Sequence, residues 1–477
     1  MKRQALNLPV LLPVFLVAIT LMVGCKQETA TLPHIILCMA DDQGWGDMAY
    51  NGHPVLLTPN FDDMAKSGLR FDRFYAAAPV CSPTRGSVMT GRNPNRFGCF
   101  SWGHTLRPQE ITVAEALRTA GYVTGHFGKW HLGSVREGSP VNPGNSGFDR
   151  WISSPNYFDN DPVLSDQGVA VQTYGESSMV TVDAALEFIR NQAGKDQPFL
   201  AVVWFGSPHD PHRAIEQDSA LYAGQDQKLC HFYGEITGMD RAFGKLRDEL
   251  KVLGISENTI LWYCSDNGGL PGVGSTGGRG HKAQLYEGGL RVPSLIEWPA
   301  VITQPGTTGV PGLTSDIYPT LLEIAGVTMK NQAPLDGISL VPLLKGQMVK
   351  RPEPIGFWQY PEAGIRTPTQ LLMTALLLEQ QTGSPIDSSQ LDLHAGDISN
   401  QYPLDIFPGH SAWLDWPYKL HRIQEMNGKV VFEFYNLEND PDELFDLSES
   451  ESALVASMKS QLENWQSSVI MSLNGND

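Results

Sequence analysis

The hydrophobic positions along the chain fall into short apolar runs, each of which ends in a polar or glycine-rich turn. These runs cover residues 34–42, 198–210, 258–269 and 292–299. Near-continuous apolar runs of this length are typical of strands that are buried on both faces of a sheet. We therefore expect these segments to be strands of one buried sheet.

Segments with helical periodicity lie between the apolar runs. They cover residues 112–121, 181–192, 232–254 and 315–326. Gly121, Gly254 and Gly326 stand at the ends of three of these segments, where a glycine commonly terminates a helix. Strands that alternate with helices predict an α/β fold, in which a mainly parallel sheet is flanked by helices on both faces. We expect this domain to cover residues 33–331.

The pattern changes near Gln332. The segment 335–346 is followed by a long irregular stretch to about Asp415, and two strand-like runs come next, at 418–423 and 429–437. A helical pattern at 451–465 comes near the end of the chain. Residues 332–477 are therefore predicted to form a smaller C-terminal α+β subdomain, an antiparallel sheet with one packing helix.

The first 25 residues have the pattern of an export signal. Lys2 and Arg3 precede an apolar run at 11–23, which is too short for a stable membrane-spanning helix. Gly24-Cys25 resembles the cleavage site of a bacterial lipoprotein, which would place a lipid anchor on Cys25. Met22 stands where such a site usually has leucine, so plain signal cleavage is the alternative. We expect an exported protein, in the periplasm or anchored to the outer membrane of a bacterium.

Composition narrows the class of ligand. The 34 Lys and Arg residues against 52 Asp and Glu give a net charge of −18, which argues against a nucleic-acid partner. The charge is uneven, because residues 81–150 have an excess of basic side chains and residues 430–458 contain acidic side chains without Lys or Arg. An anionic ligand would be drawn to the first of these regions.

Export would also place the cysteines in an oxidising compartment. Cys38 and Cys264 lie in apolar runs and are expected to be small buried side chains. Cys99 and Cys230 could pair. Cys81, in "CSPTRGSVMTGR", is a buried thiol, half of a disulfide, or a residue with a chemical role, and its own sequence context leaves all three open.

Oxygen-bearing side chains follow two of the predicted strands. Asp41 and Asp42 come after the first apolar run, and Asp266 and Asn267 come after the run that begins near 258. In open α/β sheets, ligands bind at the carboxyl ends of the strands. Three carboxylates and an amide favour Ca²⁺ or Mg²⁺ over zinc. The alternative is that the aspartates cap turns or helices.

Basic side chains follow other strands. Lys129 and His131 would point to one side of an extended segment, as suits anion binding and proton transfer. His209 and His212 follow the 198–205 strand, and His212 is expected to be a turn residue. Arg85 would share a helical face with Cys81 if a helix opens near Pro83 and ends at Gly91.

These motifs together resemble those of a known family. "PVCSPTRGSVMTGR" resembles the C-x-P-x-R signature of the type I, formylglycine-dependent sulfatases, which include arylsulfatases and N-acetylgalactosamine-6-sulfatases. "GYVTGHFGKWHLG" is similar to their second signature and departs from it at Phe127, where a smaller residue is usual. "ADDQGWGD", "SPHDP", "SDNGG" and "KAQLYEGGLRVP" match in the same order, so the resemblance is dense over residues 33 to about 300.

The resemblance implies an alkaline-phosphatase-like fold, a Ca²⁺ ion and a modified cysteine. A separate maturation enzyme would oxidise Cys81 to Cα-formylglycine, whose hydrate presents two hydroxyls on one carbon. Ca²⁺ would be held by the side chains at the two strand ends together with the formylglycine. By resemblance, these ligands are Asp41, Asp42, Cys81 in its modified form, Asp266 and Asn267.

The resemblance also implies catalytic roles. Arg85 would hold the hydrate, and Lys129 and Lys282 would bind sulfate oxygens and stabilise charge in the transition state. His209, helped by Lys282, would protonate the leaving oxygen. His131 would then take a proton from the second hydroxyl and release sulfate, so that one difficult displacement becomes two easier steps.

The substrate implied is a sulfated carbohydrate, such as one carrying galactosamine 6-sulfate, a carrageenan-type galactan or fucoidan. Several residues near the expected pocket are candidates for contact with the sugar. They are Trp102, His104, Asn156, Tyr157, Arg213, Arg279 and His281. The 356–416 stretch, with His410 and Trp413, could also reach over the pocket. The rival functions are a phosphatase or phosphonate hydrolase of the same superfamily and a non-catalytic polysaccharide-binding lipoprotein.

Overall fold

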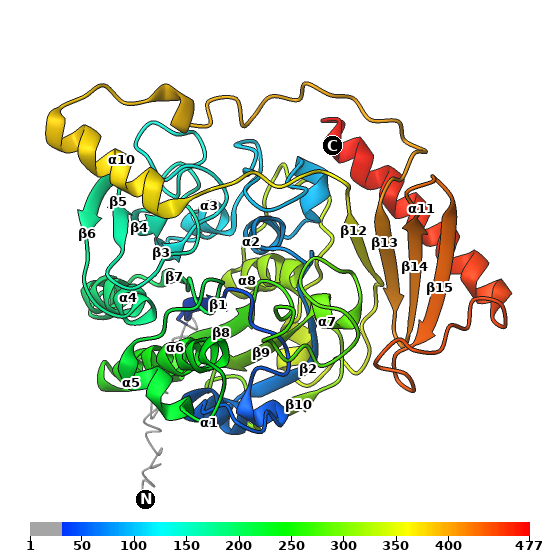
Figure 1. Cartoon of the computed structure of the whole chain (residues 1–477), viewed down its shortest axis with the longest axis horizontal. Coiled ribbons are helices and arrows are strands. Elements are labelled where there is room, and N and C mark those ends of the chain that lie inside the picture. Colours follow the sequence, from blue (N-terminus) through cyan, green and yellow to red (C-terminus); the bar gives the residue numbers. More distant parts are fainter. Residues whose placement is uncertain (1–30) are drawn as a thin grey trace, which may run out of the picture. The chain divides into compact units, whose positions relative to one another are not determined.

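A computed structural model of the chain describes residues 31–477, and the predicted export signal therefore lies outside the described residues. Residues Leu32–Asp477 form one compact unit. Its larger sheet has the strand order β10-β2-β9-β8-β1-β7-β3-β4-β5-β6, with β11 also paired to β2 (Figure 1). The strands are β1 His34–Ala40, β2 Leu69–Tyr75, β3 Val123–Lys129, β4 Arg150–Ser154, β5 Val163–Asp166, β6 Val169–Gln172, β7 Phe199–Trp204, β8 Thr259–Ser265, β9 Arg291–Glu297, β10 Gly306–Thr308 and β11 Gly312–Leu313.

The centre of this sheet is parallel, as the sequence predicts. β1 pairs in parallel with both β7 and β8, and β3 pairs in parallel with β7 and β4. β9 runs antiparallel to β8 and β2, and β5 and β6 form an antiparallel edge. The α/β fold class is therefore confirmed, and the 292–299 run is a strand of reversed direction.

Both faces of the central strands are buried. Ile35, Leu37 and Met39 of β1 belong to one hydrophobic core, and the alternate residues belong to a second core on the opposite face. This division follows from the two-residue period of a strand. A sheet covered on both faces is what the continuous apolar runs predicted.

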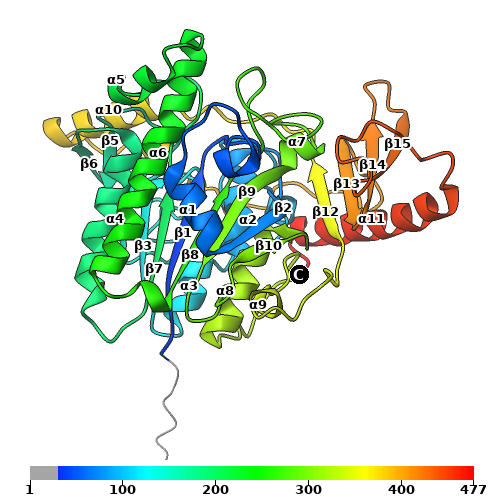
Figure 2. The same cartoon turned by 90° about the horizontal axis from the view of Figure 1, so that it is seen from below.

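Helices form the two covering layers (Figure 2). Core residues of α1, α4 and α6 pack on one face, and those of α2, α3 and α8 pack on the other. The helices are α1 Pro59–Ser67, α2 Cys81–Thr90, α3 Val113–Arg118, α4 Ser177–Ala193, α5 Glu216–Ser219, α6 Gln227–Val252, α7 Glu287–Leu290, α8 Ile317–Ala325, α9 Val341–Leu344, α10 Thr369–Thr382 and α11 Ser452–Leu473. Thr112 and Glu115 form a capping box on α3, and Gly326 ends α8 with a left-handed φ of 65°.

The C-terminal region contains the predicted antiparallel sheet and packing helix. The sheet has the order β12-β13-β14-β15, and α11 packs on it through Met458 and Leu462. The strands are β12 Ile355–Gln359, β13 His410–Asp415, β14 Tyr418–Gln424 and β15 Val430–Asn436. Tyr75 and Leu285 share a hydrophobic core with Phe357 and Tyr435, which joins the two sheets.

The stretch before Asp415 is more regular than the sequence pattern indicated. It contains β12 and the long helix α10, so the expectation of a wholly irregular segment was wrong. α10 buries little more than Thr369, Met373 and Leu376, while Leu371 and Leu378 are exposed. Leucines on both faces of α10 hide the helical period. Within residues 31–477, no helix is both long and apolar enough to cross a membrane.

Candidate active site

The predicted oxygen-bearing side chains meet at one edge of the larger sheet. β1 and β8 pair in register from His34 opposite Thr259 to Ala40 opposite Ser265, so the residues that follow the two strands emerge side by side. The amide N–H of Asp42 donates to Oδ1 of Asp266 at 3.1 Å. The side-chain amide of Asn267 donates to Oδ1 of Asp42 at 2.9 Å. The parallel pairing therefore assembles the group that the sequence predicted.

This group has the donors of a cation site. Asp41, Asp42, Asp266 and Asn267 are fully buried. Among the described residues, Oδ1 of Asp41 and Oδ1 of Asn267 accept no hydrogen bond. Buried oxygen atoms without a partner are costly unless a ligand satisfies them. Carboxylate and amide oxygens are the donors that Ca²⁺ prefers, so the residues fit that ion.

Helix α2 brings Cys81 and Arg85 to the same edge. Cys81 is the first residue of the helix, and Arg85 lies one turn further, as the predicted shared face requires. Arg85 Nη2 lies 2.7 Å from Oδ2 of Asp266, and Nη1 donates to the carbonyl of Lys129 at 3.1 Å. The guanidinium also lies 5.1 Å from the ring of Trp204. Gly91 ends the helix with a φ of 71°.

The thiol of Cys81 lies inside the cluster. Potential ligand atoms of Asp41, Asp42, Cys81 and His209 all lie within 4.8 Å of one another. Burial raises the pKa of Cys81 to about 12, so the unmodified side chain is a neutral thiol at neutral pH. The five cysteines in residues 31–477 are all free, so Cys99 and Cys230 do not pair.

Two lysines pair with carboxylates of the cluster and balance their negative charge. Lys129, at the end of β3, lies 2.6 Å from Oδ2 of Asp41. Lys282, on the loop before α7, lies 2.6 Å from Oδ1 of Asp42. With Arg85, three cations face three carboxylates. A divalent cation added to this balanced set would leave the site positive and therefore attractive to an anionic ester.

The two predicted histidines also lie at the site. His209 Nε2 is 3.6 Å from Oδ2 of Asp42, and its ring stacks on Tyr157 with the centroids 4.1 Å apart. Burial lowers the pKa of His209 to about 3. His209 is therefore neutral at neutral pH. The negative charge of Asp42 raises the pKa of the neighbouring Lys282 by more than burial lowers it, so Lys282 is protonated.

His131 follows β3 with a left-handed φ of 55°. It is 3% exposed, and neither ring nitrogen has a hydrogen-bond partner within the described part of the chain. Burial is the main reason that the pKa of His131 lies well below its usual value, and the positive charges of Lys129 and Arg85 lower this pKa further. A neutral imidazole with free nitrogens can accept a proton. His212 contacts Glu235 at 3.3 Å in the turn where the sequence placed it.

Three of the predicted sugar contacts lie beside the segment that precedes α10. Ile365 donates to the carbonyl of Trp102 at 2.8 Å, and Asn156 donates to the carbonyl of Thr367 at 3.2 Å. Trp102 is 40% exposed. The third is His104, whose ring nitrogens face two backbone carbonyls. The 356–416 stretch therefore reaches the active-site face through residues 363–367.

The other predicted contacts differ in their surroundings. Arg213 is exposed and lies 3.4 Å from Asp159, and Tyr157 stacks on His209. His281 contacts the carbonyl of Lys282. Arg279 is engaged by the C-terminal sheet, where it donates to the hydroxyl of Tyr435 at 3.0 Å.

His410 and Trp413 are directed into the C-terminal subdomain. His410 lies 2.9 Å from a ring nitrogen of His421, and Trp413 packs with Leu420 and Met458. Sequence reasoning missed Trp204 beneath Arg85, because a tryptophan in a buried strand has the pattern of an ordinary core residue. It also missed Asp392, which contacts the loop after His131 through Ser134.

Comparison with known proteins shows which family has this arrangement of residues. The sequence matches the family model described as Sulfatase over residues 33–327. The chain belongs to the sulfatase family. It is 34% identical to N-acetylgalactosamine-6-sulfatase of Mus musculus over 361 residues, covering 67% of this chain and 68% of the relative. It is 33% identical to arylsulfatase A of Homo sapiens, covering 69% and 71%.

The fold comparison agrees. The crystal structure of Ps i-CgsB in complex with k-i-k-neocarrahexaose superposes with a TM-score of 0.76 and 25% identity, covering 91% of this chain and 93% of that one. The protein is therefore a sulfuric ester hydrolase with the alkaline-phosphatase-like fold of its family, which sets aside the non-catalytic alternative.

Proposed function

We propose that this sulfatase removes sulfate from a sulfated carbohydrate, with Ca²⁺ at the strand ends and with Cys81 converted to formylglycine. The observation that carries the proposal is the position of Cys81. It is the first residue of α2, within 4.8 Å of atoms of Asp41, Asp42 and His209. A helix N-terminus favours negative charge, so a nucleophilic oxygen formed at this residue would be stabilised there.

The charged side chains support the binding of a sulfate group. The cation would polarise the sulfate oxygens, and the formylglycine hydrate would supply the attacking hydroxyl. Lys129 is buried and Lys282 is half-buried beside the carboxylates, and both would bind sulfate oxygens as negative charge develops. Arg85 is fixed by Asp266 and would orient residue 81.

Proton transfers are assigned from the positions of the neighbouring side chains. His209 and Lys282 both lie beside Asp42, so either side chain is placed to donate a proton to the leaving oxygen. His131 has two free ring nitrogens and would accept the proton of the second hydroxyl. The sequence-based assignment, in which His209 donates the proton with help from Lys282, is kept in this proposal.

The carbohydrate substrate is supported by the relatives. One is named an N-acetylgalactosamine-6-sulfatase, and one solved neighbour was crystallised with a neocarrahexaose. We also propose that a maturation enzyme acts on Cys81 before the chain folds, since the side chain is buried in the folded protein. Export as a lipoprotein through Cys25 is part of the same proposal and is consistent with a polysaccharide substrate outside the cell.

The test combines a mass measurement with an activity assay. The tryptic peptide of residues 74–85 is analysed from protein produced with a formylglycine-generating enzyme, and sulfate release is measured on 4-nitrophenyl sulfate and on a panel of sulfated oligosaccharides. We expect an aldehyde at residue 81, release from at least one oligosaccharide, and loss of both activities in Cys81→Ala. Cys230→Ala, which changes a free cysteine away from the cluster, is the matched control. Full activity of Cys81→Ala would exclude the proposed nucleophile.

A further inference from the structure

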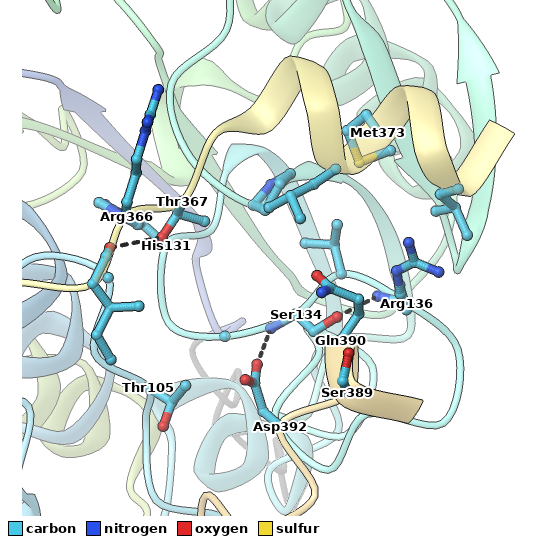
Figure 3. A pocket seen from close by; sticks show the side chains of 17 residues that line it. Thr105, His131, Ser134, Arg136, Arg366, Thr367, Met373, Ser389, Gln390 and Asp392 are labelled. Atoms are coloured by element: carbon cyan, nitrogen blue, oxygen red, sulfur yellow. Dashed lines mark hydrogen bonds between the residues drawn. The ribbon is translucent and has the colours of Figure 1, made fainter. Parts of the chain in front are cut away.

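A cavity of about 310 Å³ lies next to the catalytic cluster (Figure 3). The loop that follows β3 contributes His131, Ser134 and Arg136 to its wall. α10 and the segment around Asp392 close the other sides. Its volume is at the lower end of the range for small-molecule sites, about 300–1,000 Å³. The cavity therefore has room for a small ligand rather than a long chain.

His131 connects the cavity to the catalytic cluster. Its side chain lines the cavity, and its charged neighbours include Lys129 and Arg85 of the cluster. It is almost fully buried, yet both ring nitrogens lack partners among residues 31–477. A buried imidazole without a hydrogen bond is unusual in a finished core. A ligand that occupies the cavity would lie against the group to which the proposed function assigns a proton transfer.

The two sides of the cavity differ in chemistry. Leu372, Met373 and Leu376 of α10 form an apolar wall. The opposite side has polar groups, among them Asp392 and Gln390. One apolar wall and one wall of hydrogen-bonding groups match a pyranose ring, which has a face of C–H groups and a rim of hydroxyls.

Asp392 is the central polar group of this wall. Its Oδ2 accepts the amide N–H of Ser134 at 2.7 Å, as Figure 3 shows. Oδ1 accepts no hydrogen bond from any residue that the structure describes. Asp392 also has a left-handed φ of 52°, so its backbone is held in a conformation that few non-glycine residues adopt. The free oxygen is placed to accept a hydroxyl from a ligand.

The charges around the cavity select against an anionic ligand. Arg136 is paired with Glu379 at 2.5 Å. Arg366 extends away from His131 and Asp392 in Figure 3. Arg366 also lines the cavity and has no ion pair in the described part of the chain, but its side chain is directed elsewhere. Asp392 is therefore the charged group without a charged partner on the side of the cavity next to Ser134, and it would repel a sulfate or carboxylate group there.

We propose that this cavity is a subsite for an uncharged pyranose that is linked to the sulfated sugar. Asp392 accepts hydroxyl groups of that sugar, and Leu372, Met373 and Leu376 pack on its C–H face. The inference rests on the proposed function and makes it more specific. The enzyme acts on a glycan of at least two sugars, of which the one beside the sulfated residue is neutral.

The experiment compares two substrates in the matured full-length enzyme. One is 4-nitrophenyl sulfate, and the other is the sulfated oligosaccharide of the panel that the wild type desulfates fastest. The quantity measured is kcat/KM for the oligosaccharide divided by kcat/KM for the aryl ester. Asp392→Asn keeps an acceptor for Ser134, and Leu372→Trp fills the cavity from a half-buried position. We expect each to lower the ratio about tenfold, mainly through KM.

Asp405→Asn is the matched control, because this exposed aspartate lies in the same region and does not line the cavity. Its ratio should equal that of the wild type. An unchanged ratio in both Asp392→Asn and Leu372→Trp overturns the subsite while leaving the sulfatase activity established. A faster reaction with oligosaccharides sulfated on the neighbouring sugar overturns the assignment of a neutral ring. A wild type that releases sulfate from the aryl ester but from no oligosaccharide overturns the proposed carbohydrate substrate and the subsite together.

Discussion

Lys129 lies 2.6 Å from Asp41, so a cation is already paired with one of the carboxylates to which we assign the metal. Lys282 pairs with Asp42 in the same way. Three basic side chains thus balance the carboxylate cluster without a metal, which explains how three buried carboxylates are tolerated in the fold. A metal that takes over the carboxylates would free both ammonium groups to bind the anionic substrate.

The first prediction concerns Ca²⁺ and stability. A ligand that binds the folded state stabilises it by RT ln(1 + [L]/Kd), about 2.7 kcal/mol at 100 times Kd. We therefore expect Ca²⁺ to raise the Tm of the matured protein and excess EGTA to reverse the effect, as measured by differential scanning calorimetry. Asn267→Ala should shrink the shift, because it removes an unpartnered buried oxygen. Asn427→Ala, in an exposed turn, is the control. A Tm that does not respond to Ca²⁺ would count against the cation site.

The second prediction concerns Lys282. Removing one group that stabilises transition-state charge typically lowers kcat by about 10²–10³. Lys282→Met should therefore lower kcat for sulfate release by that order. The same change at Lys251, an exposed lysine on α6, should have no effect. If Lys282 also protonates the leaving oxygen, the loss will be larger for an alkyl sulfate than for 4-nitrophenyl sulfate. Equal losses would assign Lys282 to sulfate binding alone.

Much of this site could be predicted from local sequence. Asp41 and Asp266 follow buried apolar runs, and parallel strands bring such residues to one edge whatever the distance along the chain. The Cys81–Arg85 face follows from helical geometry within four residues. These predictions depend only on short-range pattern and on a general rule about α/β sheets.

The remaining features depend on contacts that no short-range pattern records. Arg279 lies in a glycine-rich loop, and the sequence suggested that it contacts the substrate. In the structure its guanidinium instead donates to the hydroxyl of Tyr435 and pairs with Glu433 of β15. α10 has leucines on both faces and packs only lightly, so its period was hidden. The cavity next to His131 is formed when α10 and Asp392 approach a loop more than 200 residues earlier in the chain.

The third prediction concerns Tyr157, which stacks on His209 at 4.1 Å with an angle of 12° between the rings. Such aromatic pairs contribute about 0.5–1.5 kcal/mol. Tyr157→Ala should therefore lower kcat/KM several-fold by releasing the His209 ring, while Tyr157→Phe should retain most of the activity. A steady-state assay on 4-nitrophenyl sulfate measures this without a sugar. If Tyr157→Phe is as slow as Tyr157→Ala, the hydroxyl and not the stacking is responsible.

The last prediction concerns stability away from the site. Asp240 of α6 accepts the backbone N–H groups of Asn60 and Phe61 at the start of α1, where Thr58 supplies no side-chain cap. Asp240→Ala would leave the buried N–H of Phe61 and the partly buried N–H of Asn60 without this acceptor, at a cost of about 1–3 kcal/mol. Urea unfolding should therefore show a lower midpoint with an unchanged m-value. Asp248→Ala, an exposed change on the same helix, should leave the midpoint in place. If the urea midpoint falls no further in Asp240→Ala than in Asp248→Ala, water replaces the carboxylate at the start of α1.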